Sequence, residues 1–178
     1  MSTIEELLSS PQAVGEWALV AEKSSFQFSN TTFWGAMTVK GRFTDFSGEG
    51  RIGPDGKVSG QIVIKAASLR TGIGLRDNHL RSADFFDVEH YPDIVVRVVG
   101  AQPAKSDRME VDAQLSIRGN TAALPLEVRV SRLDDGAVRL TGTTTVDRER
   151  FAVSGNMVGM VGKTTTVSAD AVFRRSGD

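Results

Sequence analysis

The sequence predicts an all-β protein whose eight antiparallel strands form one closed barrel. Apolar and polar residues alternate with a period of two along eight segments, so each strand has one buried and one wet face. Turn sequences, such as GPDG at 53–56 and DDG at 134–136, separate these segments. Several segments exceed ten residues and no helices alternate with them, which favours a barrel without exposed edges over a sandwich, the second choice.

The eight segments follow one another closely along the chain. Val111, Ala113, Leu115 and Ile117 show the pattern, because polar or charged residues stand between them. We expect strands near residues 17–29, 33–52, 57–68, 93–102, 109–118, 121–132, 137–147 and 163–175.

The start of the chain predicts a short helix. Thr3 can cap it, and Glu6 stands at the capping-box position. Ile4 and Leu7 then fall on one apolar face. Two placements remain open: a helix at the solvent rim or frayed end, and a helix whose apolar face plugs one end of the fold or docks on a partner, for example in a homodimer.

Composition excludes several classes of protein. The net charge of the 178 residues is -1, which argues against nucleic-acid binding. No cysteine is present, so disulfides, thiolate metal sites and cysteine nucleophiles are excluded. The only histidines, His79 and His90, lack the spacing of metal ligands, and we expect no metal and no cofactor.

The chain start also bears on location. Residues 2–10 carry no Lys or Arg and no long apolar run, so we expect no secretion signal and a cytoplasmic location. No segment approaches the ~18–20 consecutive apolar residues of a membrane span, so we expect no stable membrane insertion.

The segment TGIGLRDNHLRSADFFDVEHYPDI, residues 71–94, interrupts the strand pattern with dense charge and aromatic rings. We expect a two-turn helix near residues 75–82, in which Asp77 precedes Arg81 by four positions, the favourable order for an ion pair. Phe85 and Phe86 would anchor the segment in the apolar interior. The segment is then a structural clamp, a head-group site or a catalytic site.

Small residues on the inward faces, such as Gly41, Gly60, Ala113 and Gly142, leave two interpretations. Large and small side chains either interdigitate in a solid core or leave an elongated apolar cavity. Met157 and Met160 belong either to an adaptable lid or to a Gly-rich loop with core methionines. The candidate lining residues are Phe26, Phe28, Trp34, Phe43, Ile62, Ile64, Phe85, Phe86, Ile94, Val96, Leu115, Met157, Met160 and Phe173.

Three other motifs carry little weight. GMVGKT at 159–164 lacks the glycine and the following helix of a phosphate-binding loop. Asn30-Thr31-Thr32 is a glycosylation sequon, which means little without a secretion signal. Arg148 and Arg150, which flank Glu149, are expected to be a solvated charge run.

Motifs along most of the chain carry a resemblance. The most specific begins at Thr71-Gly72, continues as Arg76-Asp77-x-His79-Leu80-Arg81-Ser82-x-Asp84-Phe85-Phe86-Asp87 and ends at Tyr91-Pro92. The others are Trp17-x-Leu19, Ser24-Ser25-x-x-Phe28, Val39-x-Gly41-x-Phe43-x-x-Phe46, Leu115-x-Ile117-Arg118-Gly119, and Asp147-Arg148 with Phe151-x-Val153.

With these motifs the chain, from about 17 to 173, resembles the YceI-like family of lipocalin-like, polyisoprenoid-binding barrels. The resemblance implies an eight-stranded barrel with a helical segment against it and an amphiphilic isoprenoid, a polyprenyl chain or quinone-like lipid, inside. It also implies a periplasmic role for members that carry a secretion signal. We expect residues 1–15 to be a helical extension and residues 16–176 to be a single lipid-binding domain.

The predicted function is non-catalytic binding, storage or transport of such a lipid, with Arg76 or His79 meeting an anionic or carbonyl head group. The alternative is an enzyme acting on an apolar substrate in the same cavity, with Arg76, Asp77 and His79 at its mouth. The direction of these side chains distinguishes the two, because general acid–base catalysis requires a group that faces the cavity.

Overall fold

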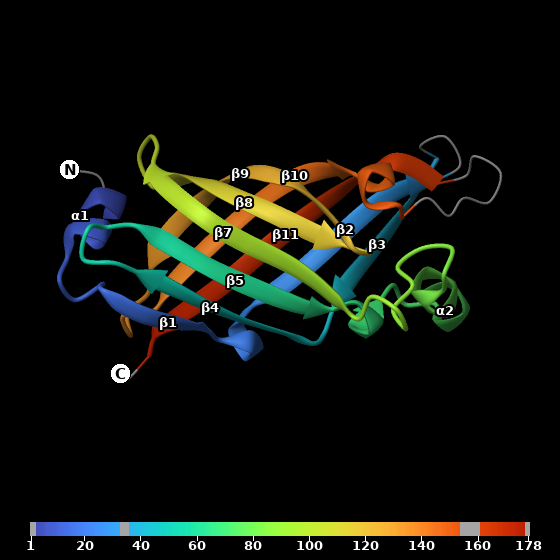
Figure 1. The fold of residues 1–178 in the computed structure, drawn as a ribbon, viewed down its shortest axis with the longest axis horizontal. Helices are drawn as coiled ribbons and strands as arrows, with labels where there is room; N and C mark the ends of the chain where they lie inside the picture. Colours follow the sequence, from blue (N-terminus) through green and yellow to red (C-terminus); the bar gives the residue numbers. More distant parts are fainter. Residues whose placement is uncertain (1–2, 33–35, 154–160, 177–178) are drawn as a thin grey trace.

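The computed structural model describes residues 3–32, 36–153 and 161–176, which form an elongated barrel with one short helix at each end (Figure 1). Its strands are β1 (Gly15–Leu19), β2 (Ser25–Thr32), β3 (Met37–Phe43), β4 (Phe46–Ile52), β5 (Val58–Lys65), β6 (Leu69–Arg70), β7 (Asp93–Pro103), β8 (Arg108–Ile117), β9 (Asn120–Arg132), β10 (Val138–Asp147) and β11 (Val161–Arg175). The helices are α1 (Thr3–Ser9) and α2 (Gly74–Arg81), and short 3-10 turns are η1 (Ala21–Lys23), η3 (Ala66–Ser68) and η4 (Arg148–Phe151).

These segments occupy eight places around an antiparallel barrel, as the sequence predicts. Two of the predicted strands are interrupted. The first is divided by η1 into β1 and β2, and the second is divided at residues 44–45 into β3 and β4. Each remaining place holds one long strand, and two-residue β6 pairs with β3.

A single strand closes the barrel. β11 pairs with β1, where Trp17 lies opposite Arg175, and with β2, where Phe26 lies opposite Ala169. From β4 onward each strand pairs with its neighbour in chain order, β6 aside, so the barrel is an up-and-down meander. The β1–β11 pairing closes the barrel, whereas β3 ends the branch β11–β2–β3, and among the described strands only β6 pairs with its outer edge, at Arg42 and Phe43.

The interruption at η1 has its own hydrogen bonds and packing. The Ser24 hydroxyl donates to Val20 O at 2.7 Å and accepts from the backbone N–H of Val172 at 2.9 Å, which replaces ladder bonds where the strand breaks. Val20, Ala137 and Val172 form a small buried cluster there. Since Val172 faces away from the barrel interior, this cluster is a second apolar contact outside the wall.

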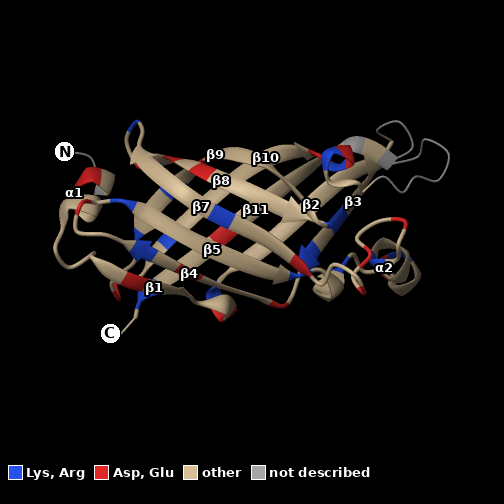
Figure 2. Cartoon of the chain, in the orientation of Figure 1, with Lys and Arg blue, Asp and Glu red and all other residues tan. Residues whose placement is uncertain are grey.

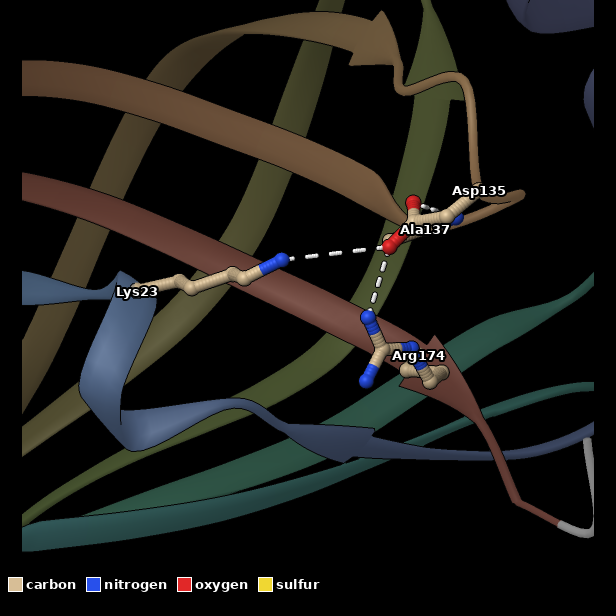
Figure 3. A network of polar contacts seen from close by, with 4 residues as sticks. All are labelled: Lys23, Asp135, Ala137 and Arg174. Carbon is tan, nitrogen blue, oxygen red and sulfur yellow. Dashed lines mark hydrogen bonds and ion pairs between the residues drawn. The ribbon is translucent and has the colours of Figure 1, made fainter.

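An ion-pair network beside this cluster ties the β9–β10 turn to β11 and η1 (Figure 3). Asp135 accepts from the Ala137 backbone N–H at 3.1 Å and from Arg174 at 2.6 Å, and Lys23 lies 3.9 Å away. The Ala137 hydrogen bond and then Arg174 hold the pKa of Asp135 below its usual range. The stabilisation is therefore present above the ordinary carboxyl pKa and lost as the pH falls through the lowered one, and it is small because the groups are exposed.

Helix α1 plugs one end of the barrel (Figure 1). Ile4 is fully buried and Leu7 is 7% exposed, and both join the main core. Trp17 donates its indole N–H to Ala13 O at 2.9 Å, which holds the connection between α1 and β1. The plug interpretation is therefore confirmed, and the solvent-rim interpretation is wrong. The same apolar face is covered by the chain itself, so it does not offer a surface to a second copy.

Charged residues of both signs are distributed over the barrel rather than gathered by sign (Figure 2). This distribution agrees with the near-zero net charge. Within the described ranges, each helix falls short of the length and apolarity needed to cross a bilayer.

Close packing at one glycine gives a stability prediction. A Cβ on Gly41 would overlap the ring of Phe28 on the neighbouring strand, whereas a Cβ on Gly100 has no atom within 4 Å. We expect Gly41→Ala to lose about 1–3 kcal/mol of unfolding free energy through overpacking. Gly100→Ala should be neutral or slightly stabilising, because it only restricts the unfolded chain. Urea denaturation of both variants is the test, and equal stabilities would show that Phe28 moves aside at no cost.

Candidate binding cavity

The barrel encloses an apolar cavity of about 570 Å³. Its wall is built from the inward face of every long strand, and the side chains of Ile4 and Leu7 close it at the α1 end. At the other end, α2 and the loop after it contribute Leu80, Phe85 and Phe86. The cavity hypothesis is therefore confirmed, and the hypothesis of a solid interdigitated core is wrong.

The predicted lining residues that the structure describes all border this cavity. They are Phe26, Phe28, Phe43, Ile62, Ile64, Phe85, Phe86, Ile94, Val96, Leu115 and Phe173, with Arg76 and His79 among the polar residues. Trp34, Met157 and Met160 lie outside the described residues. That any of these side chains contacts a ligand stays a prediction.

Aromatic rings cluster where the cavity meets the α2 segment. Phe43 lies between Phe28 and Phe86, with ring centroids 5.4 and 6.3 Å away. Phe85 is 5% exposed, and its ring meets that of His79 edge to face at 5.1 Å. Phe85 therefore anchors the α2 segment in the core, as expected, and Phe86 borders the space.

The polar residues of α2 are occupied by the turn that precedes the helix. The buried Asp77 carboxylate accepts hydrogen bonds from the backbone N–H, at 2.9 Å, and from the hydroxyl of Thr71. Arg76 donates to the Thr71 hydroxyl at 2.8 Å and to the Thr71 carbonyl at 2.9 Å. Arg76 and Asp77 therefore hold one loop residue between them, which is the geometry of a structural clamp.

The predicted ion pair between Asp77 and Arg81 is wrong. Arg81 instead donates to Ala67 O at 2.9 Å and Leu69 O at 2.8 Å. These carbonyls belong to the short η3–β6 stretch, so the guanidinium binds the helix to the wall beneath it. Asp77 is already satisfied by Thr71, and tertiary partners thus override the spacing within the helix.

The β8–β9 turn is tied to the loop that follows α2. Arg118, at a positive φ of 51°, donates to Phe85 O at 2.8 Å and to Ala152 O at 3.1 Å. Next to it Gly119 has a φ of 74°, and its Cβ would lie 3.0 Å from the Tyr91 ring. The Arg-Gly motif at the β8–β9 turn thus holds both the α2 loop and η4 in place.

Arg148 is not part of a solvated charge run. It is 7% exposed and borders the cavity. Its guanidinium donates to Gly162 O at 2.9 Å and to Val153 O at 2.6 Å. Burial lowers the pKa of Arg148, and the neighbouring Asp147 and Glu149 partly offset this effect. The charge is tolerated in an apolar wall because backbone carbonyls solvate it.

Asn30 is a second cavity residue that motif reasoning misses. Its side-chain amide donates to Gly162 O at 3.0 Å and to the Thr165 hydroxyl at 2.8 Å. Asn30 and Arg148 therefore converge on one carbonyl at the α2 end of the cavity. The strand alternation does indicate that both residues face inward. Asn30 follows Phe26 and Phe28 at a period of two, and Arg148 follows Thr144 and Val146 in the same way.

Known proteins share this architecture. The YceI-like domain matches residues 17–173, which is most of the chain. The chain belongs to the YceI-like family. A related curated protein, a UPF0312 protein of Vibrio cholerae, is 26% identical over 128 residues, 67% of each chain. A further UPF0312 protein of Vibrio cholerae is 30% identical, but the match spans about half of this chain and 47% of the relative.

Solved structures show the same YceI-like fold. Burkholderia cenocepacia BcnA superimposes with a TM-score of 0.79 at 20% identity, covering 86% of this chain and 98% of BcnA. A polyisoprenoid binding domain from Saccharophagus degradans superimposes with a TM-score of 0.74 at 19% identity, covering 89% and 98%. At these identities the likeness concerns the fold.

The histidines of this YceI-like chain pair with nearby carboxylates. His79 Nε2 lies 3.4 Å from Asp84 Oδ2, and His90 Nδ1 lies 2.9 Å from Asp87 Oδ1. Among the described residues, no three histidine or acidic side chains gather as a metal site. The hydrogen bond and charge of Asp87 raise the pKa of His90 above its usual 6.5.

This pair gives a pH prediction. Because the pKa of His90 is raised, its pairing with Asp87 stabilises the fold below pH 6.5 and is lost as the pH rises through the raised value. In an NMR titration we expect the His90 midpoint above 6.5 and its return toward that value in Asp87→Asn. Asparagine tolerates the positive φ of 48° at this position. Glu89→Gln is the matched control and should shift the midpoint less; a larger shift there would assign the effect to Glu89.

Proposed function

We propose that the protein binds an amphiphilic isoprenoid-type lipid in its barrel, without catalysis. The observation that carries the proposal is the apolar cavity of about 570 Å³ that lies between α1 and α2. Its volume falls within the roughly 300–1,000 Å³ typical of small-molecule sites. Membership of the YceI-like family and the likeness to a polyisoprenoid binding domain support an isoprenoid as the lipid class.

The cavity suits a tail better than a polar molecule. Moving one methylene from water into an apolar site yields about 0.8 kcal/mol, so ten buried carbons contribute roughly 8 kcal/mol before the cost of association. The wall at the α1 end includes Ile4, Leu7 and Val130, whereas polar side chains such as Asn30 and Arg148 border the α2 end. An amphiphile would therefore place its tail toward α1 and its head toward α2.

Binding is favoured over catalysis because the polar residues of α2 already have structural partners. Arg76 and Asp77, which an enzyme would need at the mouth, bind Thr71 instead. His79 packs against Phe85 and lies beside Asp84. A group that already has a structural partner must break that bond to move a proton to or from a substrate.

Native mass spectrometry with lipid extraction tests the proposal. The protein as purified should carry, or take up from added prenyl lipids, one isoprenoid per chain. A mass of the protein alone, with no uptake of prenyl alcohols, quinones or prenyl phosphates, would refute lipid binding.

A cavity-filling substitution gives a quantitative prediction. Ala169 on β11 borders the cavity, whereas Thr145 on β10 is exposed on the outside. We expect Ala169→Trp to weaken binding of a 20-carbon prenyl lipid at least tenfold, because the indole occupies space needed by the tail. Thr145→Trp adds the same ring outside and should bind as the wild type does. Fluorescence displacement measures both, and equal affinities would place the lipid elsewhere.

A further inference from the structure

Three basic side chains gather on the outer face of the barrel next to α2. Lys40 and Arg42 point outward from β3, because the adjacent Val39 borders the cavity. Arg70 on β6 lies directly opposite Arg42, and all three basic residues are exposed. None of the three takes part in an ion pair within the part of the chain that the structure describes. Like charges opposite each other destabilise a strand pair, so an anionic partner would relieve this arrangement.

The neighbouring strands offer these cations no compensating charge. Ser29 lies opposite Lys40 on β2, and Gln27 lies opposite Arg42. Arg70 donates to carbonyls of η3 and of β6 itself. The cluster is a local exception to the mixed charge of the barrel, and Figure 2 shows the basic positions of β3 at the end that carries α2.

Exposed apolar side chains stand beside this basic cluster. The chain leaves β6 at Arg70 and enters α2 through Ile73 and Leu75, which are 53% and 84% exposed. Arg81 donates to Leu69 O at 2.8 Å, which holds α2 against β6 and keeps the apolar side chains near the cations. Exposed apolar side chains next to basic ones are typical of surfaces that bind the interface of an anionic membrane.

Three carboxylates that follow α2 have partners of their own. The pairs are Asp84 with His79, Asp87 with His90, and Asp93 with Lys65. Arg118 binds the loop that carries the first two carboxylates to the β8–β9 turn. These carboxylates therefore leave the cations of β3 and β6 uncompensated.

We propose that this outer surface docks on an anionic phospholipid bilayer. It consists of Lys40, Arg42, Arg70, Ile73 and Leu75. The cations would meet lipid phosphates while the two apolar side chains enter the interface, whereas an acidic protein would match the cations alone. Arg76 and Leu80 of the same helix border the cavity, so docking would bring the α2 end of the cavity to the membrane. The inference goes beyond the proposed lipid binding, and its test requires no lipid in the cavity.

Vesicle sedimentation tests the docking on the unmodified protein. We expect at least tenfold tighter binding to vesicles of phosphatidylcholine with phosphatidylglycerol than to phosphatidylcholine alone, because each basic residue near the surface strengthens binding about fivefold. High salt should remove the difference. Equal binding to both kinds of vesicle, or binding to neither, would overturn the inference, and neither result would contradict lipid binding in the cavity.

Matched variants assign the binding to this surface. Arg42→Gln should weaken binding to the anionic vesicles about fivefold, whereas Arg97→Gln, which removes an exposed arginine from β7, should leave it unchanged. Leu75→Ser should weaken it about tenfold, whereas Val99→Ser, at a 51% exposed position of β7, should not. Equal effects of the surface variants and their controls would overturn the assignment.

A single fluorescent label locates the contact directly. The chain has no cysteine, so Leu75→Cys provides one site for an environment-sensitive dye. We expect its emission to shift to the blue with excess anionic vesicles, because the dye enters the interface with α2. The same dye at Val99→Cys should keep its spectrum, and a shift at Val99 with none at Leu75 would place the contact on another face.

Discussion

The structure depends on the pairing of one strand, β11, with both pieces of the first strand. This pairing closes the sheet and converts a row of inward side chains into an enclosed space. The break at η1 does not open the wall, because Ser24 restores the hydrogen bonds and Val172 packs beneath the turn. Without closure, the same alternation would yield an exposed apolar face rather than a cavity.

Polar residues at the α2 end serve mainly to fix backbone. Arg81, Arg118 and Arg148 each donate to main-chain carbonyls of segments that have few ladder bonds of their own. Arginine suits this task because its planar group presents several donors in fixed directions. The dense charge of residues 71–94 is thus used to shape an end of the barrel.

Much of this arrangement follows from the period of two. The eight places of the barrel and its inward residues could be predicted, because alternation fixes which side chains face inward. The anchoring of Phe85, which lies in the loop after α2, could be predicted from its large apolar ring instead. The prediction of a solvated Arg148 is wrong, and the sequon at Asn30 does not indicate a cavity residue, because neither local motif takes account of the strand alternation that both residues continue. The partners of Arg81 could not be predicted, because they are carbonyls brought near by tertiary folding.

The position of α1 at the end of the barrel limits the size of molecule that the cavity can hold. Because α1 closes one end of the barrel, the distance from α1 to the α2 end limits the length of a chain that can lie inside it. Ile4 and Leu7 lie at the closed end of the cavity, and Phe86 borders it at the α2 end. For the proposed lipid, a tail that is too short would leave this end unfilled and a longer one would have to fold back or protrude, so the first helical turn of the chain would limit the tail length that fits.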